Sequence, residues 1–593
     1  MRKLLFILFI SFSFLRVDAT HLMGGEITWE CIKDPASPDL GKYIFTMKLY
    51  RDCDGTTLSQ FAETIQVWAD GVNFQNINCD FISNTDISPL CDVANSGNAQ
   101  LDCYGFNPAG AVEEYVYQSL PVQLIGTPPA TGWHFTWDSC CRNGAITNLV
   151  LSSPTSPSEG FTLRASMFPF LDNFGNVVPA DPCFDSSPKF NESPKTIICT
   201  GYPFAYSHNA SDPELDSITY QWAEPLDDFF AAYNPPAVPA PLPFVAPYTF
   251  NSPIPSISAG GVQLDPITGE ISYHSNIAGT FATTISVKAF KCGQLVSEIF
   301  RDIPAVLINC GALVSGGQNN PPVVTAPIGN QTWTQTIGTS GLPSYGTTIN
   351  AGELVTFDIN ADDLDLYAGG IPQDLTMTIS GGQVTPCNNP PCATFTDVNG
   401  NTTITAASLV SGMFSWQTDC AQILSAAGCG NTTNIFTFLV KVVDDFCPAN
   451  AIRIATIKIT VLPATTQPAP LFQCVTENSV GDVSITWNHH PNANSSTSYN
   501  IYASDNISGP FNLLSTVNYP NDITLIPAAN IPLGTEFYYM TLESLCASTS
   551  ESSDTIMPIQ LDITSANVNC WDDLDGRIAI NMLSNVITPF TYI

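Results

Sequence analysis

Positively charged residues are scarce in this sequence. Its 593 residues include 18 Lys and Arg against 53 Asp and Glu, which gives a formal net charge of −35 at pH 7. A surface with this balance repels nucleic acid and anionic lipid and attracts cations, so we expect no nucleic-acid partner. Charged residues make up only 12% of the chain and hydrophobic residues 44%. That composition suits an exported protein with packed cores rather than a disordered acidic tail.

Sequence motifs of hydrolytic catalysis are also missing. The chain contains neither GxSxG, the nucleophile turn of many serine hydrolases, nor HExxH, the zinc motif of many metalloproteases. It has only six His. Asp and Glu are abundant, but no pair stands out as the acid and base of a glycoside hydrolase. We predict that the chain is not an enzyme, has no catalytic residues, and has no cofactor other than the structural cation considered below.

Long hydrophobic runs are confined to the N-terminus. Arg2 and Lys3 precede an apolar segment at 4–15, and small residues follow at 17–19. This is the pattern of a secretory signal peptide that is cleaved before Thr20. An N-terminal membrane anchor is the alternative, although the apolar segment is short for a bilayer span. No later segment offers about 20 apolar residues without Pro or charge, so we expect a secreted or cell-surface protein.

Cysteine is plentiful and unevenly distributed. Of the 19 cysteines, nine lie between Cys31 and Cys199 and five between Cys387 and Cys447, whereas Cys570 stands alone near the end. Without paired CxxC motifs, disulfides of an oxidising compartment are favoured over zinc binding. Sequence alone leaves their connectivity open. We expect the partner of the single Cys570 to lie beyond the sequence.

Alternation of apolar and polar residues runs through most of the chain. Tyr43, Phe45, Met47 and Leu49, for example, alternate with polar or small neighbours, as in a half-buried strand. Clusters of Pro, Gly, Asn and Asp separate such segments, and amphipathic helical patterns are rare. Two packed antiparallel sheets are the simplest way to bury one face of each strand. We therefore predict an all-β chain of tandem β-sandwich modules that follow a cysteine-rich β region.

Pro-rich linkers and changes in pattern divide the chain into six parts. Stretches at 319–324 and 465–470 have the composition of linkers. The predicted parts are a signal peptide at 1–19, a cysteine-rich β region of one or two subdomains at 20–200, β-sandwich modules at 201–318, 319–464 (Ig-like) and 465–560, and an incomplete segment at 561–593.

Residues 471–560 resemble a fibronectin type III domain. Trp487 lies in the expected second strand, YNIY at 499–502 in the third, and Tyr538-Tyr539 in the strand that carries the tyrosine corner of this family. The resemblance implies an extracellular spacer or binding module without chemistry of its own. The candidate disulfide of this module joins the two cysteines that bracket it, Cys474 and Cys546.

Residues 201–312 resemble cadherin-like and Ig-like modules of bacterial surface proteins. The match lies in SDPELD at 211–216, in the strand ITYQW that follows it, and in DPITGEI at 265–271. In that family, carboxylates near module junctions can bind Ca²⁺. The late strand departs from the family pattern, because Lys288 and Phe290 stand where an Asp-rich ending is usual.

Clustered carboxylates make Ca²⁺ the candidate structural cation, since this ion takes several oxygen ligands. No cluster matches the EF-hand loop. The alternative is a set of solvated turn residues whose carboxylates cap nearby backbone N–H groups. The candidate ligands form two groups, one at Asp212, Glu214 and Asp216 and one at Asp362, Asp363, Asp365, Asp444 and Asp445.

Three N-terminal motifs resemble, in their order, the start of large surface proteins of gliding Bacteroidetes. They are THLMGGEITWEC at 20–31, KLYRDCDG at 48–55 and WDSCCRNG at 137–144. Proteins of that group often leave the cell by the type IX secretion route. The resemblance implies a location on the outer cell surface and an adhesive role.

The last segment resembles the first half of a SprB-type repeat, which occurs in gliding adhesins. The match lies in Cys570, in DLDGRI at 573–578 and in TPFTY at 588–592. The residues before Pro589 depart from the repeat. The resemblance implies that 561–593 is a truncated repeat.

These observations predict a secreted cell-surface protein, an adhesin or a gliding-motility-associated protein that mediates attachment. Its partners would be surface glycans or proteins, and a type IX secretion machinery would act on a missing C-terminus. The alternatives are non-catalytic accessory modules of a secreted hydrolase whose catalytic domain lies beyond residue 593, and a purely structural component of the envelope.

Overall fold

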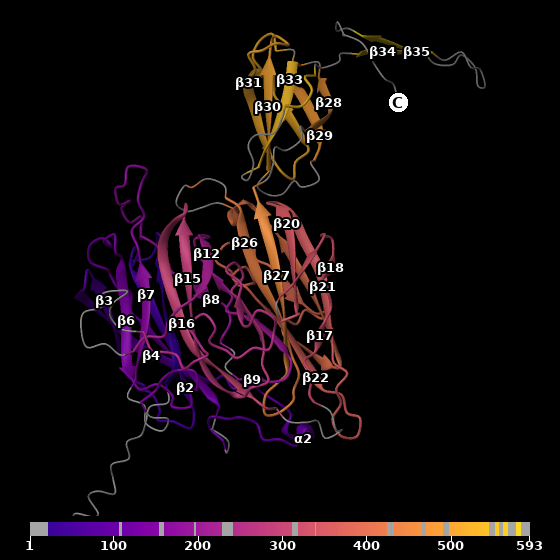
Figure 1. Ribbon diagram of the computed structural model, residues 1–593. Helices are drawn as coiled ribbons and strands as arrows, with labels where there is room; N and C mark the ends of the chain where they lie inside the picture. The colour runs from indigo at the N-terminus through magenta and orange to yellow at the C-terminus, as the bar shows by residue number, and fades with distance from the viewer. Residues whose placement is uncertain are drawn as a thin grey trace, which may run out of the picture. The chain divides into compact units, whose positions relative to one another are not determined.

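The computed structural model forms two compact units (Figure 1). The first consists of 1–349, 354–417 and 424–461, and the second of 350–353, 418–423 and 462–593. The structure describes residues 22–566 and 577–582 with gaps at 106–109, 153–158, 195–196, 228–240, 311–317, 339, 424–428, 430–431, 464–469, 479, 490–496, 536, 545–551 and 557–560. The predicted signal peptide therefore lies outside the described residues.

Regular structure in the described ranges is almost entirely β, as predicted. Helical structure there consists of the short α2 (Val93–Ser96) and the 3-10 turns Cys420–Gln422 and Ala528–Asn530. None of the described helices is long and apolar enough to cross a membrane.

An 11-stranded sheet dominates the first unit. Its strand order is β1-β2-β5-β4-β3-β6-β7-β16-β15-β12, and β9 pairs with β16. Tyr43, Phe45, Met47 and Leu49 of β2 are all buried, which confirms the predicted alternation. The strands are β1 (Leu22–Cys31), β2 (Tyr43–Asp52), β3 (Glu63–Ala69), β4 (Val72–Asp86), β5 (Val112–Ser119), β6 (Trp133–Cys140), β7 (Gly160–Met167), β9 (Ile197–Cys199), β12 (Ser217–Trp222), β15 (Gly279–Lys291) and β16 (Gln294–Ile308).

The first and the last of the seven N-terminal strands, β1 and β7, both pair with β16. One edge of this strand pairs with β7 at Ser297–Ile299, with β1 at Arg301 and Asp302, and with β9 at Val306–Ile308. The other edge pairs with β15. The strands from β1 to β7 therefore curl around a shared aromatic core, in which the ring of Phe135 lies 5.1 Å from that of Trp29 and 4.8 Å from that of Phe45.

This sheet crosses the predicted boundary near residue 200. Strands β1 to β7 precede that residue, whereas β12, β15 and β16 follow it, and hydrogen bonds join both sets. The cysteine-rich region and the first sandwich module therefore share one sheet and one hydrophobic core. The reason is the length of β16, whose 15 residues contact strands from both regions.

Smaller sheets complete the module that follows residue 200. One is three-stranded, in the order β10-β14-β13, and the other pairs β11 with β8. Phe204 of β10 and Tyr273 of β14 belong to the same core as Ile285 of β15. The strands are β8 (Lys189–Phe190), β10 (Pro203–Ser207), β11 (Ala210–Ser211), β13 (Gln263–Leu264) and β14 (Glu270–His274).

The last module of the first unit is a sandwich of two antiparallel sheets. A five-stranded sheet has the order β17-β21-β25-β23, with β18 also pairing with β21, and a six-stranded sheet has the order β19-β20-β27-β26-β22-β24. Between them, Phe357 stacks on Phe414 at 4.5 Å, and Phe414 meets Phe438 edge to face. The strands are β17 (Val323–Val324), β18 (Ile328–Gly329), β19 (Thr334–Ile337), β20 (Pro343–Asn350), β21 (Leu354–Asp362), β22 (Asp374–Ser380), β23 (Thr394–Thr396), β24 (Ile404–Ala407), β25 (Leu409–Gln417), β26 (Asn434–Val443) and β27 (Ile452–Leu462).

The second unit contains a smaller sandwich with the predicted strands. Its sheets have the orders β28-β29-β32 and β31-β30-β33. Trp487 of β29 packs against Tyr499 of β30 with ring centroids 5.2 Å apart, and Tyr538 of β33 is buried beside them. The strands are β28 (Leu471–Glu477), β29 (Val483–Asn488), β30 (Thr497–Ser504), β31 (Asn512–Asn518), β32 (Ile523–Ile526) and β33 (Phe537–Ser544).

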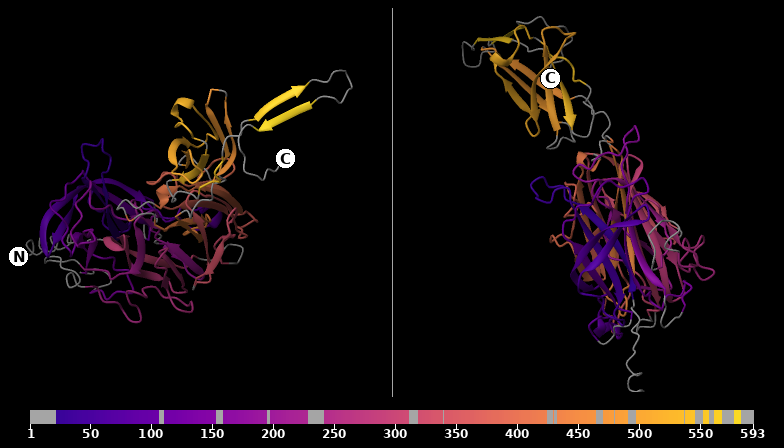
Figure 2. Two further views of the ribbon diagram at one scale, coloured as in Figure 1. Left: turned by 90° about the horizontal axis from the view of Figure 1, so that it is seen from above. Right: turned by 90° about the vertical axis from the view of Figure 1, so that its left-hand side faces the viewer.

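Two predictions for this end of the chain fall partly outside the described residues. Cys474 has an exposed free thiol, and Cys546 lies in a gap, so a bond between them is not part of the described structure and stays a prediction. In the final segment, β34 (Leu561–Ala566) and β35 (Arg577–Met582) form an antiparallel pair (Figure 2). Cys570 lies outside the described residues.

Candidate cation sites

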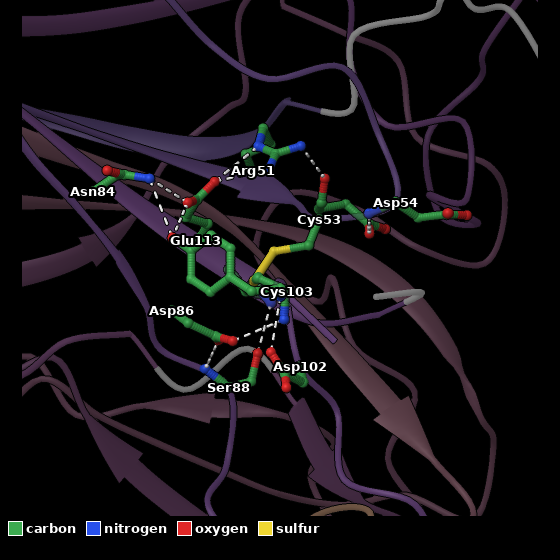
Figure 3. Close-up of a disulfide and its surroundings, with 12 residues drawn as sticks. Arg51, Cys53, Asp54, Asn84, Asp86, Ser88, Asp102, Cys103 and Glu113 are labelled. Carbon is green, nitrogen blue, oxygen red and sulfur yellow. Dashed lines mark hydrogen bonds and ion pairs between the residues drawn. A yellow bond between two sulfur atoms is a disulfide. The ribbon is translucent and has the colours of Figure 1, made fainter. Parts of the chain in front are cut away.

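Two of the three N-terminal motifs place a buried ion pair in the first unit. Arg51 of the RDCDG motif donates to Glu113 at 2.8 Å, both side chains being buried, and the neighbouring Cys53 forms a disulfide with Cys103 (Figure 3). Arg142 of the third motif, WDSCCRNG, pairs with Asp302 of β16 at 2.8 Å. Each buried guanidinium therefore has a carboxylate counter-ion, which is the condition for tolerating such a charge in a core.

The first predicted carboxylate group lies in a buried cluster around a lysine. Asp212 turns the chain, because its Oδ1 accepts from the N–H groups of Glu214 at 2.9 Å and Asp216 at 3.1 Å. Lys291, at the end of β15, places its Nζ 2.8 Å from Asp185 Oδ1 and 3.3 Å from Asp216 Oδ2. We call Asp185, Asp212, Glu214, Asp216 and Lys291 the first cluster.

Opposite charges hold the first cluster in its buried position. Burial raises the pKa of Asp212 well above its usual range, and the neighbouring Glu214 charge raises it further. Burial alone would lower the pKa of Lys291, but Asp185 and Asp216 outweigh this effect and raise it. Lys291 therefore stays protonated. Lys33, whose side chain is partly exposed, adds an ion pair to Glu214.

The second predicted carboxylate group is only partly brought together. Asp444, which follows β26, accepts from Asn319 Nδ2 at 2.7 Å, and Gln373 donates to Asn319 Oδ1 at 2.7 Å. Asp363 Oδ1 accepts from the N–H of Asp365 at 2.8 Å. We call these five residues, Asn319, Asp363, Asp365, Gln373 and Asp444, the second cluster.

Two oxygen atoms of the second cluster have no hydrogen-bond partner. They are Asp363 Oδ2 and Gln373 Oε1, and their side chains belong to residues that are 6% and 1% exposed. Burial raises the pKa of Asp363 to about 6, and Asp365 contributes through its charge. Burial also raises the pKa of Asp444 well above its usual range. A buried oxygen without a donor is costly unless something else satisfies it.

The remaining predicted ligands lie apart from these contacts. Asp445 accepts from the hydroxyl of Tyr367 at 2.7 Å and from the N–H of Asp374 at 3.2 Å, and Asp362 ends β21. In the described residues, no three His, Cys, Asp or Glu side chains are arranged as a complete metal site. Calcium binding therefore stays a prediction. The sequence analysis did not include Asp185, Lys291, Asn319 and Gln373, although Asn319 lies in the linker predicted at 319–324.

A polar groove also lies in the first unit, between the β13–β14 hairpin and the face of β19, β20 and β27. Its volume is about 880 Å³. Its lining is rich in hydroxyl groups, among them Thr334, Thr336, Thr456 and Thr460, with Lys458 as its one basic residue among the described ones. Glu270 lines this groove, and its carboxylate accepts a hydrogen bond from the hydroxyl of Thr456.

Comparisons with known proteins leave the family open. No family model matches the chain, and no curated protein matches it. Among solved structures, domains A168–A170 of titin align at 12% identity over 62% of this chain and 98% of that chain, with a TM-score of 0.15. The FN1–FN3 domains of chicken CNTN1 align at 10% identity over 62% and 96%, with a TM-score of 0.15. Cadherin-like domains 1 to 4 of zebrafish RET align at 11% identity over 84% and 97%, with a TM-score of 0.22. At these TM-scores the fold assignment rests on the sheets described above.

Proposed function

We propose that this protein is exported to the outer surface of a bacterial cell, where its β-sandwich modules mediate attachment to glycans or proteins. The observation that carries the proposal is the set of long-range disulfides in an all-β chain. Cys31–Cys183, Cys91–Cys447 and Cys292–Cys429 join residues 152, 356 and 137 positions apart. Bonds of this kind persist in oxidising compartments.

A surface for attachment is offered by the hydroxyl-lined groove. Threonine hydroxyls are both donors and acceptors, which suits recognition of neutral polar ligands such as sugars. We further propose that the protein is associated with gliding motility and leaves the cell by the type IX route, which the N-terminal motifs and the SprB-like segment alone support. The modules then serve as spacers and binding elements rather than as a catalyst.

Surface exposure and attachment test this proposal directly. Protease added to intact producing cells should remove the protein, and deletion of its gene should reduce attachment of the cells to surfaces. The control is a sample of cells lysed before protease is added, in which proteins from inside the cell are also accessible to the protease. Protection from external protease, or unchanged attachment after deletion, would contradict the proposal.

A further inference from the structure

One lysine of the first unit is buried together with its partner. The side chain of Lys291 is 8% exposed and that of Asp185 is 0% exposed. The other lysines that form ion pairs in the described part of the chain keep between 19% and 44% of their side chains exposed. The basic groups of Arg142 and Arg301 are buried too, but a guanidinium does not lose its proton in proteins. Among the described ion pairs, Lys291 is therefore the one that combines a nucleophilic amine with exclusion of water.

Neighbouring contacts hold Lys291 and Asp185 against each other. The Nζ of Lys291 lies 2.8 Å from Asp185 Oδ1. The indole N–H of Trp29 donates to the backbone carbonyl of Asp185 at 3.1 Å, and the hydroxyl of Ser186 accepts from the N–H of Cys31 at 3.1 Å, so this segment is fixed on β1. Lys291 ends β15, where the chain turns into β16. A contact fixed in this way needs no chance encounter between the amine and the carboxyl group.

A second carboxylate stands beside the amine as a proton acceptor. Asp216 Oδ2 lies 3.3 Å from Lys291 Nζ, and the Asp216 side chain is 2% exposed. Burial raises the pKa of Asp216, and it raises the pKa of Asp185 to about 8. Both carboxylates therefore take up a proton more readily than an exposed aspartate does. Lys291 is protonated at rest, so a neighbouring acceptor of this kind is what its amine needs to become a nucleophile.

We propose that Lys291 and Asp185 join in an isopeptide bond, a covalent cross-link inside the first unit. Asp216 accepts one proton from the ammonium group, and the freed amine attacks Asp185 Cγ. One further proton from the nitrogen and the proton held by Asp216 then leave with a carboxyl oxygen of Asp185 as water. An N–C bond forms and a C–O bond breaks. One ammonium and one carboxylate thus give one amide and one water, without an oxidant or a cofactor, and Asp216 is regenerated.

Burial favours the amide over the ion pair. Two charges held away from water carry a large desolvation cost, and a neutral amide avoids it. The water that forms passes to the solvent, and the buried position shields the new bond from hydrolysis. The reaction also removes one oxygen from a carboxyl group whose Oδ2 has no hydrogen-bond partner among the described residues. These conditions are met at Lys291 and Asp185 together.

Mass spectrometry of the purified full chain, denatured and with its disulfides reduced, tests the cross-link. The mass should be lower than the sequence requires by one water molecule. Trypsin should give a branched peptide that joins 165–189 to 289–301, because a modified Lys291 is no longer a cleavage site. An unlinked chain gives 289–291 and 292–301 instead. A full mass together with these unbranched peptides would overturn the proposal and leave an ordinary buried ion pair.

Three variants assign the bond to its residues. Lys291→Arg keeps the positive charge but has no nucleophilic amine, so its mass should equal that of its sequence. The matched control is Lys288→Arg on the same strand, whose lysine lies 3.7 Å from Glu298; it should still lack one water. Asp216→Asn should slow bond formation by about a hundredfold or more, seen as full mass in freshly synthesised protein.

Two results with these variants would contradict the assignment. A mass deficit that persists in Lys291→Arg would place the bond elsewhere in the chain and overturn the proposal. A cross-linked fraction equal to that of the wild type in fresh Asp216→Asn would overturn the role of Asp216. The branched peptide of the wild type decides the question even if Lys291→Arg does not fold.

Discussion

Among single residues, His134 shows how burial sets the response of the fold to acid. It lies on β6, is 5% exposed, and places its Nδ1 2.8 Å from the hydroxyl oxygen of Ser166. Burial lowers its pKa to about 4, against a weaker raising effect of a backbone hydrogen bond at Thr131. The imidazole therefore stays neutral in the folded protein at pH values where an unfolded chain is already protonated.

Acid should therefore destabilise the first unit partly through His134. Between pH 6.5 and about 4 the unfolded chain binds a proton that the folded chain does not, so stability falls as the pH is lowered. The loss from this residue amounts to roughly 3 kcal/mol over that range. Urea midpoints measured as a function of pH should fall less steeply for His134→Asn than for the wild type. Parallel pH profiles would contradict this assignment.

The junction of β1 with β16 depends on two adjoining features of β1. A Cβ at Gly24 would lie 2.1 Å from the carbonyl oxygen of Asp302, so only glycine permits this approach of the two backbones. Two residues after Gly24, Glu26 pairs with Arg301 in the strand register. Its carboxylate accepts a hydrogen bond from Arg301 Nη2 at 3.0 Å. The GGE sequence of the first motif thus has a packing role.

Removal of the charge at this junction should be costly. Glu26→Gln leaves the buried guanidinium of Arg301 without its counter-ion, and we expect the free energy of unfolding of the first unit to fall by about 3–5 kcal/mol. Urea unfolding followed by tryptophan fluorescence measures the change.

Glu30→Gln provides the control on the same strand. Glu30 pairs with Lys189, and 53% of its side chain is exposed, so its substitution should cost less than about 1 kcal/mol. Equal losses of unfolding free energy in Glu26→Gln and Glu30→Gln would show that the cost does not depend on burial of the ion pair.

Strands and module types were predictable because their signal is local. The alternation of Val483, Ile485 and Trp487 needs only the six residues of β29, and all three side chains are buried. The pairings of β16 with β1, β7 and β9 were not predictable, since they join segments far apart in the sequence. For this reason the boundary expected near residue 200 does not separate two sheets.

The candidate sites were predictable to a similar extent. Asp212, Glu214 and Asp216 form a compact motif, so sequence spacing is enough to group them. Lys291 joins that group only because β15 pairs with β12, and Asp185 only because β8 pairs with β11. The carboxylate motif therefore indicates a place for positive charge, and strand pairing brings Lys291 there to supply it.

At the scale of the whole molecule, the disulfides determine how far the chain can be stretched. Cys31 connects to Cys447 most directly through Cys53–Cys103 and Cys91–Cys447. The polypeptide along that route consists of 31–53 and 91–103, roughly 35 residues, which extend to about 120 Å. The uninterrupted chain from Cys31 to Cys447 would extend to about 1,400 Å.

Single-molecule force spectroscopy can measure this difference. Pulled by its ends under oxidising conditions, the first unit should lengthen by no more than the short route allows, and a reductant should release the long one. A long extension before reduction would show that the bonds are not formed as described. On the cell surface proposed above, the first unit would therefore transmit the drag of flowing water as a short tether even after its sheets unfold.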